Sequence, residues 1–141
     1  MAINNKTSAN VSAWMTIEDV APAGFALEQF STDAGIVAEA VQDVQAEPTL
    51  DGHMVVGYTP NLQTVSITLQ PTSPSLPYLR QLVQAQRSTR SPLEVNLTVT
   101  LPATGRTYRF VEGVLTNSQS MPGVNRVQDP LVYQFTFRAV Y

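Results

Sequence analysis

The stretch Leu93-Glu94-Val95-Asn96-Leu97-Thr98-Val99-Thr100-Leu101 decides the fold class of this chain. Apolar and polar residues alternate through it with a period of two, and such residues face opposite sides of a β-strand. The polar side holds Asn, Thr and a single carboxylate. The pattern therefore predicts a strand that is buried on one face only, as in an antiparallel sheet.

Three more segments of the second half show the same alternation. They are Val65 to Leu69, Arg106 to Thr116 with Tyr108 and Phe110 on one side, and Leu131 to Arg138. A turn is expected at Ala103-Thr104-Gly105, and Gly113 is expected to mark a β-bulge. We predict a mainly β fold, an antiparallel β-barrel or sandwich.

One segment has helical periodicity instead. Leu76, Leu79 and Val83 recur at helical spacing, Ser75 precedes them as a candidate N-cap, and Pro77 falls in the first turn, where its missing N–H costs little. We expect one α-helix over about residues 75–87, flanking the sheet.

The first half predicts fewer elements. Strands are expected at Trp14–Val20 and Phe25–Phe30, separated by Ala21-Pro22-Ala23-Gly24. Trp14, the sole tryptophan, is expected to fill the core, with an interface anchor as the alternative. Ala38–Gln45 fits helix or strand. Residues 1–10 are small and polar and predict a flexible arm ahead of a single domain over residues 11–141.

A hairpin is predicted around Asp51-Gly52, which leads into His53–Tyr58 as a tight turn does. His53 is also the only histidine, and the chain has no cysteine. Catalysis and metal binding usually need several histidine, cysteine or clustered carboxylate side chains, so we expect no enzyme, no catalytic residue, no metal and no cofactor. No run of 18 apolar residues occurs, so no membrane-spanning segment is expected.

The charges divide unevenly along the chain. Residues 1–60 carry eight acidic residues and only Lys6 as a base, whereas residues 61–141 carry seven arginines and three acidic residues. One interpretation is that the halves neutralise each other within one domain. The other is that acidic and basic surfaces join identical subunits head to tail. The acidic chain has no basic run interleaved with aromatics, so nucleic-acid binding is not expected.

The run from Leu50 to Tyr141 resembles the tail tube proteins of contractile-tailed bacteriophages. The matching stretches, in chain order, are Leu50 to Gly57, Pro60-Asn61-Leu62 before Val65 to Gln70, Ser73-Pro74-Ser75 before the helix with Leu79 and Leu82, Thr107 to Phe110, Gly113 to Thr116, and a closing strand with Tyr133, Phe135 and Phe137. No single motif among them is diagnostic, but their order is distinctive.

The resemblance implies a structural virion protein of the tail, assembled in the host cytoplasm. Its copies form hexameric rings that stack into a hollow tube around a tape-measure protein and inside a sheath, and DNA passes through without specific binding. The alternatives are a type VI secretion tube-like protein or a tail terminator ring. A small-ligand-binding β-barrel is the alternative of a different class.

Two sets of residues are candidates for the assembly. A channel wall should avoid exposed cations, since each neutralised phosphate adds affinity for DNA. The polar faces of two strands meet this condition and are candidates for the lumen: Thr64, Ser66, Thr68, Gln70, Glu94, Asn96, Thr98 and Thr100. An ordinary solvent face reads the same way. The candidate inter-subunit residues are the hairpin and helix-side ones: Glu47, Asp51, His53, Met54, Arg80, Arg87 and Arg90.

Overall fold

The computed structural model describes residues 11–30, 35–102, 104–124 and 126–141. The expected N-terminal arm, residues 1–10, lies outside the described residues. Within the described part there are nine strands and one helix: β1 Ser12–Ile17, β2 Ala21–Ala26, β3 Ile36–Ala38, β4 Val44–Pro48, β5 Met54–Tyr58, β6 Gln63–Leu69, α1 Leu76–Thr89, β7 Val95–Leu101, β8 Arg106–Ser118 and β9 Leu131–Val140.

Seven strands form one antiparallel sheet in the order β2-β1-β7-β8-β9-β6-β3. The mainly β fold with one helix is confirmed. Of the two expected architectures the open, sandwich-like one is correct, because the sheet ends at β2 and β3 and does not close into a barrel. Strands β4 and β5 form a separate two-stranded sheet.

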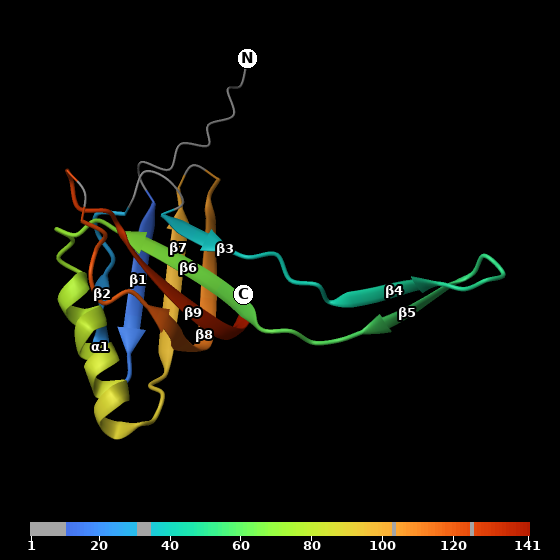
Figure 1. The fold of residues 1–141 in the computed structure, drawn as a ribbon, viewed down its shortest axis with the longest axis horizontal. Coiled ribbons are helices and arrows are strands. Elements are labelled where there is room, and N and C mark those ends of the chain that lie inside the picture. The colour runs from blue at the N-terminus through green and yellow to red at the C-terminus, as the bar shows by residue number, and fades with distance from the viewer. Residues whose placement is uncertain (1–10, 31–34, 103, 125) are drawn as a thin grey trace, which may run out of the picture.

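One face of the large sheet carries the core. Strand β7 shows how the alternation builds it, because Val95, Leu97 and Val99 are buried while the residues between them are not. Helix α1 lies at one side of the sheet (Figure 1) and adds Leu76, Leu79 and Leu82 to the same core cluster. Each fully buried leucine of this kind contributes roughly 1.5–3 kcal/mol.

The start of α1 differs from the expected cap. Ser75 is the N-cap residue, but its side chain forms no capping bond. Its hydroxyl instead donates to the carbonyl of Ala26 and accepts from the amide of Glu28, both at 3.0 Å. The helix runs from Leu76 to Thr89, two residues beyond the expected end, and stops at Arg90 in the left-handed conformation. Ser75 thus joins the helix to the end of β2.

Two expectations for the first half are wrong. Ala21–Gly24 does not separate two strands but belongs to β2, which pairs with β1. Trp14 is not in the core, since 47% of it is exposed. Its indole lies on Gly24, where a Cβ would fall 2.1 Å from Nε1, and the close contact of ring and glycine holds Trp14 on the face opposite the core.

The long strand β8 contains the predicted bulge. Its pairing with β7 shifts between Val95 and Leu97, so two residues of β8 oppose Asn96. Glu112 adopts a positive φ of 53° there, and its amide donates to Oδ1 of Asn96 at 3.1 Å. The neighbouring Gly113 lies against the Phe137 ring. A Cβ added to Gly113 would lie 2.2 Å from that ring.

We predict that Gly113→Ala lowers the free energy of unfolding by about 1–3 kcal/mol, because the added methyl group overlaps the buried ring of Phe137. Urea unfolding measures the change. Gly57→Ala is the matched control, since a Cβ there meets nothing within 4 Å, and it should change stability by less than ~0.5 kcal/mol. Equal effects of the two substitutions would contradict the packing described for Gly113.

Candidate assembly interface

The hairpin β4–β5 projects from the sheet as an arm, which we define as residues 44–58 (Figure 1). The predicted hairpin is confirmed. Every residue of both strands is exposed, and the arm shares no strand pairing with the large sheet. Residues 39–43, within the stretch that fitted helix or strand, form a linker between β3 and β4.

The arm has one wholly apolar face. Residues that pair directly across an antiparallel ladder share a face, and Val44 pairs with Tyr58, Ala46 with Val56, and Pro48 with Met54. The opposite face holds Gln45, Gly57, Glu47 and Val55. All six residues of the apolar face are exposed, with Met54 at 68% and Tyr58 at 74%. Nothing in the described chain covers this face.

Hydrogen bonds at the base hold the arm on the body. The amides of Glu39 and Thr59 donate to the carbonyls of Thr64 and Asp43 at 2.9 and 2.7 Å. The side-chain amide of Gln63 donates to the carbonyl of Glu39 at 2.6 Å, and that of Asn61 donates to Gln42. A hollow of about 330 Å³ lies between these linkers. The attachment is therefore mainly polar.

Hydrogen bonds also order the tip of the arm. The amide of Thr49 donates to the carbonyl of His53 at 2.7 Å, and the amide of His53 donates to Oγ1 of Thr49 at 3.1 Å. The Thr49 hydroxyl donates to the carboxylate of Asp51. This bond lowers the pKa of Asp51 below its ordinary value, more than desolvation raises it. Leu50 is fully exposed at the end of the turn.

The candidate inter-subunit residues fall into two groups that the subunit does not bring together. Glu47, Asp51, His53 and Met54 are exposed on the arm and its tip. Arg80, Arg87 and Arg90 are exposed on α1 and its C-cap. Figure 1 shows the helix and the arm on opposite sides of the sheet. If these groups meet, they belong to different copies of the chain.

The candidate lumen residues share one surface, the outer face, which is the side of the large sheet opposite the core. Thr64, Ser66 and Thr68 of β6 and Asn96, Thr98 and Thr100 of β7 alternate with buried residues. Gln70 and Glu94 lie just beyond the ends of these strands. Strands β8 and β9 separate the two sets, so both belong to one broad face.

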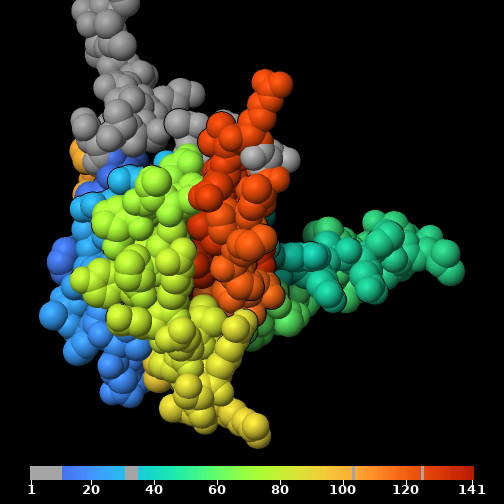
Figure 2. Space-filling view, turned by 60° about the vertical axis from the view of Figure 1, so that its left-hand side comes forward, coloured from blue at the N-terminus to red at the C-terminus, as the bar shows by residue number. Residues whose placement is uncertain are grey.

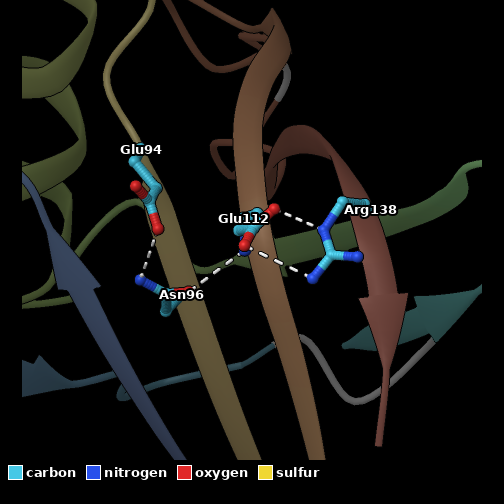
Figure 3. Close-up of polar contacts among 4 residues, drawn as sticks. All are labelled: Glu94, Asn96, Glu112 and Arg138. Carbon is cyan, nitrogen blue, oxygen red and sulfur yellow. Dashed lines mark hydrogen bonds and ion pairs between the residues drawn. The ribbon is translucent and has the colours of Figure 1, made fainter.

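Strands β8 and β9 bring arginines to the outer face, which the β6 and β7 patterns did not reveal. Arg109 pairs with Thr98 across the β7–β8 ladder. Arg138 of β9 forms an ion pair with Glu112, which raises the pKa of the arginine. The polar chain continues through Asn96 to Glu94 (Figure 3). The outer face is thus polar and partly neutralised, but it is not free of cations.

Within the ranges described, no group of three His, Asp or Glu side chains is arranged to hold a metal ion. The same residues include no helix that is long and apolar enough to cross a membrane.

We predict that the stability of the arm tip depends on pH. The folded pKa of Asp51 lies below its ordinary value of 3.8, so the tip is most stable above that value and loosens as the pH falls through the folded pKa. Thr49→Val removes the donor hydroxyl and should move the Asp51 pKa back up, whereas Thr49→Ser should keep it low. NMR titration of the Asp51 carboxyl carbon measures both. Equal pKa values in the two variants would show that the hydroxyl is not the cause.

Two solved structures resemble the whole chain. A chain in the cryo-EM structure of the anti-feeding prophage baseplate superposes with a TM-score of 0.59 at 12% identity, over 100% of this chain and 96% of that one. A chain in the structure of an extracellular contractile injection system, described as the PVC sheath/tube terminator in the extended state, gives 0.56 at 9% identity, over 99% and 98%. At these identities the likeness shows the fold alone.

No curated protein matches the sequence. A family model described as tail fiber protein gp32 matches residues 4–141. The expected relation to phage tails is therefore confirmed, although this family is not described as a tube family. Because the match spans nearly the whole sequence, the chain belongs to the tail fiber protein gp32 family.

Proposed function

We propose that this protein is a structural subunit of a contractile tail and not an enzyme. Its copies close into rings of six, in line with the "6-fold symmetrised" baseplate that contains a similar chain, and the rings stack into the inner tube of the virion. The tube encloses a tape-measure protein, lies inside the sheath, and lets DNA pass without specific binding. Assembly takes place in the host cytoplasm.

The apolar face of the arm carries the proposal. A two-stranded hairpin is marginally stable in water unless it packs against something else. Exposed apolar patches of this kind mark interaction sites. The arm has six apolar residues on one face and none of its strand residues is buried. Contact with another subunit would bury the face that the single chain leaves in water.

The outer face supports a role as a channel wall. Thr, Ser and Asn side chains form the outward sides of β6 and β7, and they offer a passing phosphate backbone no fixed positive charge. Glu112 balances Arg138 on the same face. Arg109 also lies on this face, where it pairs with Thr98.

Two alternatives have unequal support. A tail terminator ring is favoured by the likeness to a chain from a sheath/tube terminator structure, and a type VI secretion tube-like protein has no observation of its own. A small-ligand-binding barrel is disfavoured because the sheet stays open and large side chains fill its core face, among them Tyr133, Phe135 and Phe137.

Negative-stain electron microscopy of the purified full chain tests the proposal. We expect rings or stacked tubes above a threshold concentration, because the arm gains a partner only by association. A terminator would form single rings that do not stack. A protein that stays monomeric at the highest concentration, with or without a seeding baseplate, would contradict the proposal.

Hydrogen exchange should locate the contact on the arm. The amides of β4 and β5 should exchange fast in the free subunit and slowly in the assembled fraction, since few apolar contacts protect the isolated hairpin. The amides of β7 serve as the internal control, because they are protected in both states. Equal exchange of the arm in the two states would show that the arm is not part of the interface.

The channel wall is tested by adding charge. Thr68→Lys or Thr98→Lys should leave tubes able to assemble but slow DNA ejection, because a ring repeats the cation around the bore and each cation attracts phosphate. Thr68→Gln and Thr98→Gln are the matched neutral controls and should eject normally. Ejection at the parental rate from virions that contain the lysines would show that this face does not line the channel.

A further inference from the structure

A cationic groove runs between α1 and the segment that follows β8. Four residues at helical spacing line its helical side, namely Arg80, Val83, Gln84 and Arg87. Ser118, Gln119 and Ser120 line the other side, and Tyr133 also borders it. The hollow measures about 210 Å³. In Figure 2 the helix (yellow-green to yellow) lies beside the segment after β8 (orange).

The two arginines of the groove form no ion pair with a carboxylate of the described residues. The ion pairs among the described residues are His53–Asp51 and Arg138–Glu112, so neither Arg80 nor Arg87 is neutralised by one. Arg80 and Tyr133 line the same groove. Burial raises the pKa of Tyr133, and the charge of Arg80 opposes that rise. Residues 75–92 contain three arginines and no acidic residue.

The arm has the complementary chemistry. Residues 39–63 contain four carboxylates, Glu39, Asp43, Glu47 and Asp51, and no Lys or Arg. The tip also presents Leu50, which is fully exposed. Beyond the groove the chain continues into a loop with three exposed apolar side chains, Met121, Val124 and Val127. The acidic arm and the basic groove are thus opposite in charge, and exposed apolar side chains accompany both.

The two surfaces cannot meet within one subunit, because the arm projects away from the side of the sheet where α1 lies (Figure 1). They are different surfaces of the same chain, so a contact between them is heterologous. Repeated heterologous contacts generate closed rings or open stacks. Opposite charges at such a contact also favour one orientation over the others.

We propose that the groove between α1 and residues 118–120 receives the arm tip of a second copy of this chain. Glu47 and Asp51 of the incoming tip face Arg87 and Arg80, and Leu50 covers Val83. The apolar face of the arm packs along the loop that contains Met121 and Val124. The proposal rests on the proposed assembly of identical subunits and names the surface through which they join.

Disulfide trapping tests the contact directly, because the natural chain has no cysteine. Leu50→Cys is placed in one tagged full-length chain and Gln84→Cys in a second chain with a different tag. Mixed under mild oxidation at assembling concentration, the two should form a disulfide-linked heterodimer in high yield. The control pairs Leu50→Cys with Thr107→Cys on the outer face and should give at least about tenfold less product, since distant thiols cannot form the bond.

Two results of the trapping experiment overturn the proposal. One is equal yield with Gln84→Cys and Thr107→Cys. The other is preferential linkage of Leu50→Cys to itself, which would mean that arms pair with arms across a two-fold axis.

Charge reversal supplies an independent test. Arg80→Glu with Arg87→Glu should raise the concentration needed for half assembly by about tenfold or more, because two attractive contacts become repulsive. Arg106→Glu with Arg109→Glu reverses two exposed arginines on β8 and is the matched control, expected to assemble like the parent. Adding Glu47→Lys and Asp51→Lys to the groove variant should restore assembly.

The failure of this site is distinguishable from the failure of the proposed function. If the parent forms rings or tubes and the groove variant does so at the same concentration, the groove is not the receptor and ring assembly stands. If the parent itself forms no assembly, the proposed function fails, and the absence of the Leu50–Gln84 cross-link then overturns this contact too.

Discussion

The burial of one face of a seven-stranded sheet is the constraint on which the rest of the structure depends. Alternation in β6, β7 and β9 places the buried apolar residues of these strands on the same side. That side must be removed from water, and α1 contributes Leu76, Leu79 and Leu82 to do so. The bulge at Glu112 adds one residue to β8 and so reverses the alternation of its side chains. As a result Phe110, before the bulge, and Leu115, after it, both enter the core.

The same constraint leaves the arm without a place in its own subunit. The core is filled by side chains of the sheet and the helix, and the linkers at residues 39–43 and 59–62 carry β4 and β5 away from it. An apolar face is retained nonetheless: Val44, Val56 and Tyr58 lie together and exposed. Such an exposed face is unfavourable in a monomer, whereas association with another subunit would bury it. The fold therefore divides the chain into a body with its own core and an arm whose apolar face is exposed in the single subunit.

In the proposed association of copies, electrostatics would set the orientation. The acidic first half and the basic second half do not simply neutralise each other within the subunit, since the arm and α1 keep their charges on opposite sides. On the outer face, in contrast, neutralisation is local, as Glu112 and Arg138 on adjacent strands show. Both residues of that ion pair belong to the second half, so the pair does not show the two halves neutralising each other. A surface whose charges are neutralised within the subunit needs no partner. A surface that remains charged is available to a second copy.

The sequence by itself determined the secondary structure of the second half, the single helix, the Asp51-Gly52 hairpin and the polar character of β6 and β7, because these follow from periodicity and turn chemistry within a few neighbouring residues. It misplaced Trp14, since no local pattern shows that Gly24 makes room for an indole on the outer face. It misread Ala21–Gly24 as a break between two strands, because pairing with β1 overrides weak β propensity. Only the tertiary structure decided that the sheet stays open, that Arg109 and Arg138 join the outer face, and that the acidic arm and the basic helix lie apart. These features depend on which strands become neighbours, and strand order is a long-range property that local sequence does not encode.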